Sequence, residues 1–179
     1  FVDGFLSPVF WYVTGGILAS LFGLPPVKWA LCFMLGFKVQ STLDSMVGYK
    51  NKEYADFGWA PARGDDLMNF IPARLSLLIL WAGARFCGLD PSWGLRTALR
   101  DRLKHDSPNS AHAESFVAGA LHVRLGGPYR DAGGERNKPW LGAGNPDHGP
   151  VHVRRTVFLL KWAGWITVAM GTCILIVIR

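Results

Sequence analysis

Apolar residues gather along this chain in four runs that are separated by polar sequence. Runs of about 20 apolar residues are long enough to cross a bilayer as helices, and shorter ones have to tilt or re-enter. The pattern predicts an all-α fold, a multi-pass helical membrane protein with a polar helical and loop region between the apolar segments. The predicted membrane segments are 5–22, 27–39, 67–89 and 156–178.

The four segments are not equivalent. Segment 5–22 is uncharged, and its Gly15, Gly16, Ala19 and Ser20 would let a second helix approach closely. Segment 27–39 is short for a full span. Segment 67–89 contains Pro72, which predicts a kink in its helix. We treat 1–179 as one domain, and because it starts at Phe1 we expect that an N-terminal portion is missing.

The polar region 90–155 has its own internal pattern. An amphipathic basic helix is predicted over 93–104, a helix rich in small residues over 111–125, and a loop over 133–146. The two polar stretches 40–66 and 90–155 should share one membrane face if they build one site, and a simple crossing at 67–89 would separate them. Either 67–89 is a re-entrant or interfacial hairpin, which we favour, or one polar region folds into the membrane as a cavity wall.

Composition agrees with a membrane protein. Half of the residues are hydrophobic and the formal net charge is +6, which suits basic cytoplasmic loops. Nucleic-acid binding would also suit a basic chain, but there is no zinc-finger spacing or ribonucleoprotein motif, so no nucleic-acid partner is predicted. The three cysteines lie in apolar sequence and are expected to be buried thiols.

Between the second and third apolar runs lies the densest group of charges. Charged side chains next to segments apolar enough to enter a membrane are energetically costly unless they form ion pairs, bind a ligand or face water. Asp65, Asp66 and Asn69 share a helix face, and their oxygens suit Mg²⁺ shared with substrate phosphates. The alternative is that the two acids only favour the positive end of a helix.

Cations flank these acids. Arg63, Arg74 and Lys50 suit the binding of phosphate or carboxylate groups, which arginine can hold through two hydrogen bonds. The alternative for Arg74 is an internal ion pair with Asp66 or Asp44.

Further candidates lie in the polar region 90–155. His105, His112 and Glu114 surround residues 107–110, and a His or Glu there could take a proton from the ammonium form of an attacking amine. The alternative is that a loop histidine serves only polar packing. Asn109 and Ser110 are interpreted as substrate-binding or helix-capping residues. Two short motifs complete the set. Arg124 and Gly127 lie in one, which could form a phosphate nest or a helix stop. Lys138 and Trp140 lie in the other, where the Trp140 ring could stack on a flat ligand or lie at the membrane interface.

Six motifs occur in the order in which one family carries them: LDSMVGYK at 43–50, Asp65-Asp66 followed by NFIPARL at 69–75, SPNS at 107–110, AGAL at 118–121, RLGGP at 124–128 and KPWLG at 138–142. Together they resemble the CobD/CbiB family, the membrane-bound cobinamide (adenosylcobinamide-phosphate) synthases of cobalamin biosynthesis. The opening Val2-Asp3-Gly4 resembles the end of another family motif, so the resemblance covers only the C-terminal portion of such a protein.

The resemblance implies an acid–amine ligase. It implies that (adenosyl)cobyric acid and 1-amino-2-propanol or its O-phosphate are joined as an amide, with ATP and Mg²⁺ as cofactors. It further implies an inner-membrane, multi-pass protein in contact with lipid, with its site on the cytoplasmic side and other enzymes of the pathway as conceivable partners. The chain has no Walker loop, so ATP rests on the resemblance alone.

Motifs and chemistry together assign the candidate residues: catalytic Asp66, Arg74, His105 and Glu114; substrate-binding Asp3, Asp44, Lys50, Arg63, Asn69, Ser107, Asn109, Arg124, Gly127, Lys138 and Trp140; and metal-binding Asp65 and Asp66. Two alternatives stay open. One is a non-catalytic signalling protein of the same superfamily, similar to the AmpE-type relatives, and the other is a transporter or channel built on charged half-helices.

Overall fold

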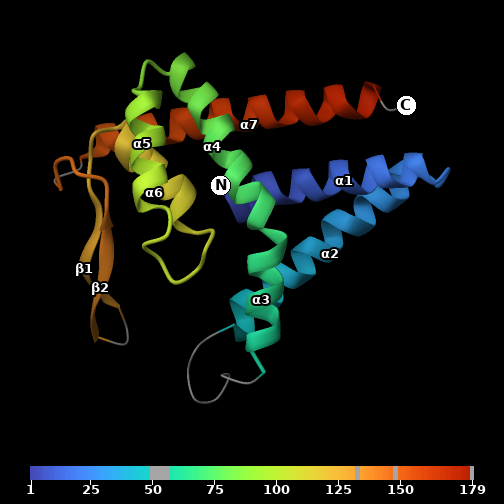
Figure 1. Cartoon of the computed structure of the whole chain (residues 1–179), viewed down its shortest axis with the longest axis horizontal. Helices are drawn as coiled ribbons and strands as arrows, with labels where there is room; N and C mark the ends of the chain where they lie inside the picture. Colours follow the sequence, from blue (N-terminus) through green and yellow to red (C-terminus); the bar gives the residue numbers. More distant parts are fainter. Residues whose placement is uncertain (49–56, 132–133, 147–148, 178–179) are drawn as a thin grey trace. The chain divides into compact units, whose positions relative to one another are not determined.

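The computed structural model describes residues 1–48, 57–131, 134–146 and 149–177. The chain is mostly helical and forms two compact units, one of Phe1–Pro72 with Gly164–Arg179 and one of Ala73–Ala163. The boundaries between these units fall inside α4 (Phe70–Phe86) and α7 (Pro150–Val177). Figure 1 colours the elements by their order in the sequence.

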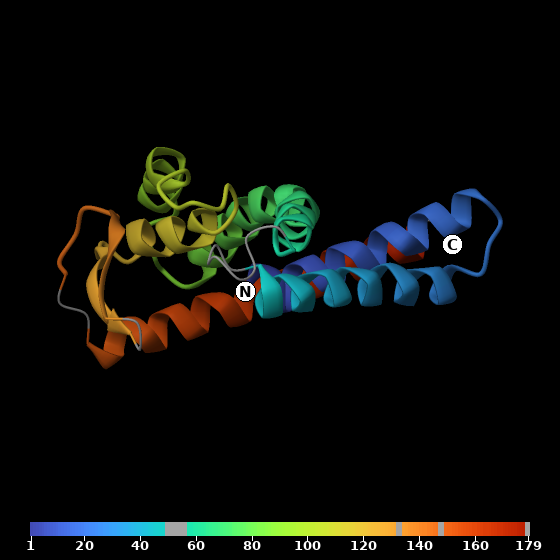
Figure 2. The same ribbon diagram turned by 90° about the horizontal axis from the view of Figure 1, so that it is seen from below.

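The first unit is built on a pair of long helices. A π-helical turn at Val2–Leu6 leads into α1 (Ser7–Leu21), and the chain reverses at Gly23 into α2 (Pro26–Val47). Figure 2 shows the two helices side by side. A Cβ atom added at Gly15 would lie 2.7 Å from the carbonyl oxygen of Trp29, so only glycine permits this approach. The predicted close packing of a helix on the small residues of segment 5–22 is confirmed.

The third helical stretch is broken, but not where the sequence predicts. Helix α3 (Trp59–Met68) ends before Asn69, and α4 starts at Phe70 with a bend of 40° between them. The expectation of a kink at Pro72 is wrong. Pro72 lies in the first turn of α4, where a backbone N–H has no intrahelical acceptor, so its missing donor costs little.

The second unit contains α5 (Pro91–Asp101) and α6 (Ala111–Ala120). The Asp90 carboxylate caps α5 by accepting a hydrogen bond from the Trp93 backbone N–H at 2.9 Å. The helices pack closely because a Cβ atom at Gly119 would lie 2.5 Å from Thr97 Oγ1. Both predicted helices end early, at Asp101 rather than 104 and at Ala120 rather than 125.

A β-hairpin corrects the all-α prediction. Strand β1 (Leu125–Asp131) pairs antiparallel with β2 (Gly134–Leu141), and Gly127 lies opposite Lys138. The expectation of a loop over 133–146 is therefore wrong for the part that forms β2. Leu141 anchors the hairpin in a small core with Ala111, Ala118 and Val123. Burial of this apolar end holds two strands that would be only marginally stable alone.

Within the described part of the chain, two helices are long and apolar enough to cross a membrane: Val2–Leu21 and Pro150–Val177. They correspond to the predicted segments 5–22 and 156–178. The bent pair α3–α4 would add a third if it forms one span. Helix α2 is longer than the predicted segment 27–39 but is not among these helices.

Candidate functional site

Four aspartates of the first unit form an acidic cluster: Asp3, Asp44, Asp65 and Asp66. They come from the π-helical turn, the last turn of α2, and α3. The charges of Asp3, Asp44 and Asp66 all act on Asp65, and those of Asp3 and Asp66 act on Asp44. Neighbouring carboxylates destabilise one another's charged forms unless they share a proton or bind a cation.

Asn69, at the break between α3 and α4, holds the cluster to α1. Its side chain is 1% exposed; its Oδ1 atom accepts a hydrogen bond from Ser7 Oγ at 2.5 Å, and its Nδ2 atom donates to Asp65 Oδ2 at 2.9 Å. The indole Nε1 of Trp11 also donates to the Met68 carbonyl, at 3.2 Å. In this structure Asn69 positions Asp65, and its contact with substrate stays a prediction.

The residues of the acidic cluster fit a carboxylate-bound Mg²⁺ ion. Asp65 Oδ1 is buried and has no hydrogen-bond partner within the described part of the chain. No group of three or more His, Cys, Asp or Glu side chains among the described residues could hold a metal alone. Mg²⁺ does not need such a group, since it commonly binds one or two carboxylates, water and substrate phosphates.

The remaining candidates of the first unit are Arg63 and Lys50. Arg63 lies exposed on α3, and Lys50 falls outside the described residues. Next to Arg63, Gly64 lets α3 approach α2, since a Cβ atom there would lie 2.5 Å from Gln40 Nε2. That amide donates a hydrogen bond to the Pro61 carbonyl at 2.7 Å, which fixes the start of α3.

In the second unit, the loop before α6 gathers the predicted polar residues. Arg74 Nη1 donates to Asn109 Oδ1 at 3.2 Å, and the Asn109 backbone N–H donates to Ser107 Oγ at 3.3 Å. His105 Nδ1 lies 3.8 Å from Glu114 Oε2. The two candidate proton acceptors thus lie together, and Asn109 connects the loop to Arg74.

The hairpin brings together the four candidates of its two motifs. The Arg124 guanidinium lies 4.2 Å from the centre of the Trp140 ring, a cation–π contact. Gly127 has φ +82°, and a Cβ atom there would overlap the same ring. Lys138 lies opposite Gly127 in the register and 5.6 Å from the Tyr129 ring. The Trp140 ring is therefore held against the hairpin.

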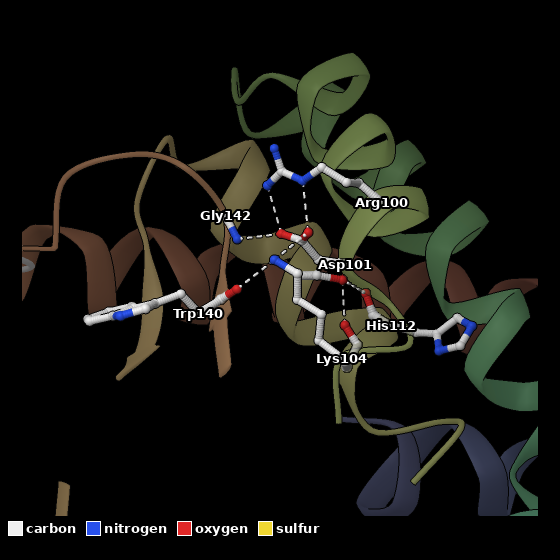
Figure 3. A network of polar contacts seen from close by, with 8 residues as sticks. Arg100, Asp101, Lys104, His112, Trp140 and Gly142 are labelled. Carbon is white, nitrogen blue, oxygen red and sulfur yellow. Dashed lines mark hydrogen bonds and ion pairs between the residues drawn. The ribbon is translucent and has the colours of Figure 1, made fainter. Parts of the chain in front are cut away.

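A polar network ties this hairpin to α5 (Figure 3). Asp101, fully buried, receives hydrogen bonds from Arg100 Nε at 2.8 Å and from the Gly142 backbone N–H at 2.8 Å. Lys104 Nζ lies 2.8 Å from Asp101 Oδ1 and donates to the Trp140 carbonyl. Burial alone would raise the pKa of Asp101, but the hydrogen bonds from Arg100, Lys104 and Gly142 outweigh it and hold that pKa well below its ordinary value.

The structure thus builds three local groups from the predicted residues: the acidic cluster in the first unit, and the Asn109 loop and the hairpin in the second. The prediction that all of them share one site stays a prediction. So does the alternative of an ion pair between Arg74 and Asp66 or Asp44.

Comparison with known proteins agrees with these motifs. The family model described as "CobD/Cbib protein" matches residues 1–160. The chain belongs to the CobD/CbiB family. Its relatives include the "Cobalamin biosynthesis protein CobD" of Pelobacter propionicus, 51% identical over 126 residues, which are 70% of this chain and 35% of that protein. No solved structure matches.

Two further relatives match nearly the whole chain. The "Cobalamin biosynthesis protein CobD" of Klebsiella pneumoniae is 40% identical over 178 residues, and the "Cobalamin biosynthesis protein CbiB" of Salmonella typhimurium is 39% identical over 178 residues. Each alignment covers 99% of this chain and 50% of the relative. The chain thus spans about half the length of these CobD/CbiB proteins.

Sequence reasoning missed two residues of this CobD/CbiB chain, Asp101 and Arg102, and it named His112 only as one of the possible proton acceptors around residues 107–110. The spacing of Arg100 and Lys104 predicts a basic helix face, yet both side chains converge on Asp101. The signal that could have revealed this pairing is the spacing of the charges, because Asp101 directly follows Arg100 and lies three residues before Lys104. Nothing in the sequence marks Arg102 or shows that His112 is buried, because burial depends on how α5, α6 and the loop between them pack.

Proposed function

We propose that the chain belongs to an ATP-dependent acid–amine ligase of cobalamin biosynthesis. The reaction joins a propionate carboxylate of (adenosyl)cobyric acid to the amine of 1-amino-2-propanol or its O-phosphate, and the product is (adenosyl)cobinamide or its phosphate. The proposal rests on the family match over residues 1–160, which includes the acidic cluster and the residues around Asn109. The activity is that of the whole protein, of which this chain spans about half.

Amide formation sets clear demands on the residues. One carboxylate C–O bond breaks and a C–N bond forms, the oxygen leaves on a phosphate group taken from ATP, and the amine gives up a proton. His105 and Glu114 are the proposed acceptors of that proton. The 3.8 Å between His105 Nδ1 and Glu114 Oε2 supports a joint role for the two side chains. Arg74, held by Asn109, supplies positive charge for a carboxylate or phosphate.

The acidic cluster is proposed to hold Mg²⁺ through Asp65 and Asp66. Bound there, the ion supplies positive charge beside phosphate oxygens. Asp65 is oriented for this by Asn69, which occupies its Oδ2 atom and leaves Oδ1 without a partner among the described residues. Asp3 and Asp44 add negative charge that attracts a cation or the ammonium group of the amine substrate.

We further propose a multi-pass protein of the inner membrane with its site on the cytoplasmic side. The two apolar helices Val2–Leu21 and Pro150–Val177 support membrane insertion. Lipid, the corrinoid and the aminopropanol substrate are the proposed partners, together with other enzymes of the pathway.

The direct test is a product assay with the full-length protein. Cobyric acid, aminopropanol or its phosphate, ATP and Mg²⁺ are mixed, and the amide is followed by mass. Arg74→Gln is expected to lower the rate about 100-fold or more, because it removes a cation from the reacting groups. Arg96→Gln, at an exposed position of α5, is the matched control and should keep the wild-type rate. Absence of amide with the wild-type protein would favour the non-catalytic alternative.

A shared site also demands that both polar regions face the same compartment. Single cysteines placed at Arg63 and Arg96, in a chain whose Cys32, Cys87 and Cys173 are replaced by serine, are expected to react with an impermeant thiol reagent from the same side of sealed vesicles. Labelling from opposite sides would contradict one shared site and would make α3–α4 a complete crossing.

A further inference from the structure

The side chain of His112 is an exception to the way buried polar groups are normally satisfied. It is fully buried at the start of α6, and neither Nδ1 nor Nε2 has a hydrogen-bond partner among the described residues. A buried polar group left without a partner costs about 1–3 kcal/mol. Such a group in a native fold calls for a bound partner or a functional reason.

The charges that act most strongly on His112 are both positive. They come from Arg74 on α4 and Arg102 just after α5, and these two guanidinium groups also act on each other. Burial, followed by these two charges, lowers the pKa of His112, so its imidazole is neutral near pH 7. Arg102 Nε is itself buried without a partner in the described part of the chain.

Asn109 joins these groups into one local structure. Its Oδ1 atom accepts from Arg74, and its backbone carbonyl accepts from the His112 N–H at 3.3 Å. The neighbouring acid belongs to a different network: Figure 3 shows the His112 ring pointing away from Asp101, which is occupied by Arg100, Lys104 and Gly142. Two cations and a buried imidazole therefore belong to one local structure, and the Asp101 carboxylate is taken up by other donors.

We propose that Arg74, Arg102 and His112 form a binding site for a phosphate group. Arginine pairs with phosphate oxygens through parallel N–H donors, and a neutral imidazole adds one N–H. An anion would relieve the repulsion between the two guanidinium groups. It would also give acceptors to the unpartnered Arg102 Nε and to the one His112 ring nitrogen that carries a hydrogen. Arg102 and His112 thereby become binding residues that the motifs do not include.

Two sources could deliver this phosphate group: the O-phosphate of the amino alcohol, or ATP. In naming these sources, the inference rests on the proposed function. The site itself does not, because inorganic phosphate carries the same oxygens and can be measured without any amide being formed.

The test measures binding of radiolabelled inorganic phosphate to the full-length protein in detergent. Wild type is expected to bind in the millimolar range or tighter, and Arg102→Gln to weaken binding at least tenfold. Arg96→Gln is the control and should match wild type, and Arg102→Lys should restore part of the affinity because it restores the charge. Thermal melting confirms that each variant is folded; if His112→Gln fails to fold, the Arg102 variants suffice.

Competition identifies the source. Displacement of labelled phosphate by aminopropanol O-phosphate but not by ATP assigns the site to the amine substrate, and the reverse assigns it to the nucleotide. Absence of phosphate binding to wild type, or equal affinities of Arg102→Gln and Arg96→Gln, would overturn the inference and leave ordered water as the partner of His112. Phosphate binding that depends on Arg102 without any amide product would instead count against the proposed function alone.

Discussion

Asp65 and Asp101 are both helical aspartates with an oxygen held by a hydrogen bond, but their surroundings are opposite. Asp65 lies among Asp3, Asp44 and Asp66, and its Oδ1 atom lacks a partner among the described residues. Asp101 is surrounded by donors and cations from Arg100, Lys104 and Gly142. A carboxylate satisfied by its own fold stabilises structure, whereas one among like charges calls for a ligand.

The largest effect that would sharpen this comparison is expected at Asp65. Asp65→Asn should lower the rate of amide formation about 100-fold, because it removes negative charge from the proposed cation site. The melting temperature should stay the same or rise, since one of four repelling charges is gone. Activity is measured by mass of the product and stability by thermal melting, with exposed Glu135→Gln as control.

Unchanged activity with a lower melting temperature would break the comparison. It would mean that Asp65 is a structural residue like Asp101, held only by Asn69.

The next effect is on stability at Asp101. Asp101→Asn should lower the free energy of unfolding by about 2 kcal/mol, since the charge-assisted hydrogen bonds from Arg100 and Lys104 are weakened. Thermal or denaturant unfolding of the full-length protein measures the change. Glu135→Gln, whose pair with Arg130 is exposed, should change stability little. A melting curve equal to wild type would show that the buried network is not stabilising.

The smallest effect is the dependence of stability on pH, and it has two windows. The pKa of His112 is lowered in the fold, so below about pH 6.5 the unfolded chain takes up a proton there that the folded chain does not, and stability falls. The pKa of Asp101 is also lowered, so its contribution is complete above about pH 4 and is lost at more acidic pH.

Melting temperatures between pH 8 and pH 3 check these windows. His112→Gln should reduce the change of melting temperature with pH just below pH 6.5. Asp101→Asn should reduce that change below about pH 4. The same slope in both variants and in wild type would assign the pH dependence to other groups.

Much of the helical architecture was readable from the sequence because it depends on local pattern. The uncharged run 5–22 and the run 156–178 became α1 and α7, and the small residue Gly15 lies where α2 comes close. The break at Asn69 was not readable, because the hydrogen bonds from Ser7 and to Asp65 compensate for it only in the folded chain.

The hairpin was missed for a related reason. Residues 134–141 contain Gly, Asn, Lys and Pro and have no apolar alternation that would predict a strand. They become β2 because Leu141 is buried beside α6 and because Gly127 makes room for the Trp140 ring. These are contacts between residues far apart in the sequence, which no local pattern records.

The sequence by itself determined the family and the two helices that are apolar enough to cross a membrane. Motif order and the lengths of apolar runs are properties of the chain alone, so they can be recognised without a structure. Only the tertiary structure decided which partners each charged or titratable side chain has. It paired Arg100 and Lys104 with Asp101, left His112 buried beside Arg74 and Arg102, and gathered four aspartates from three elements. The physical reason is that the energy of a charge depends on its neighbours in space and on its burial, and packing sets both.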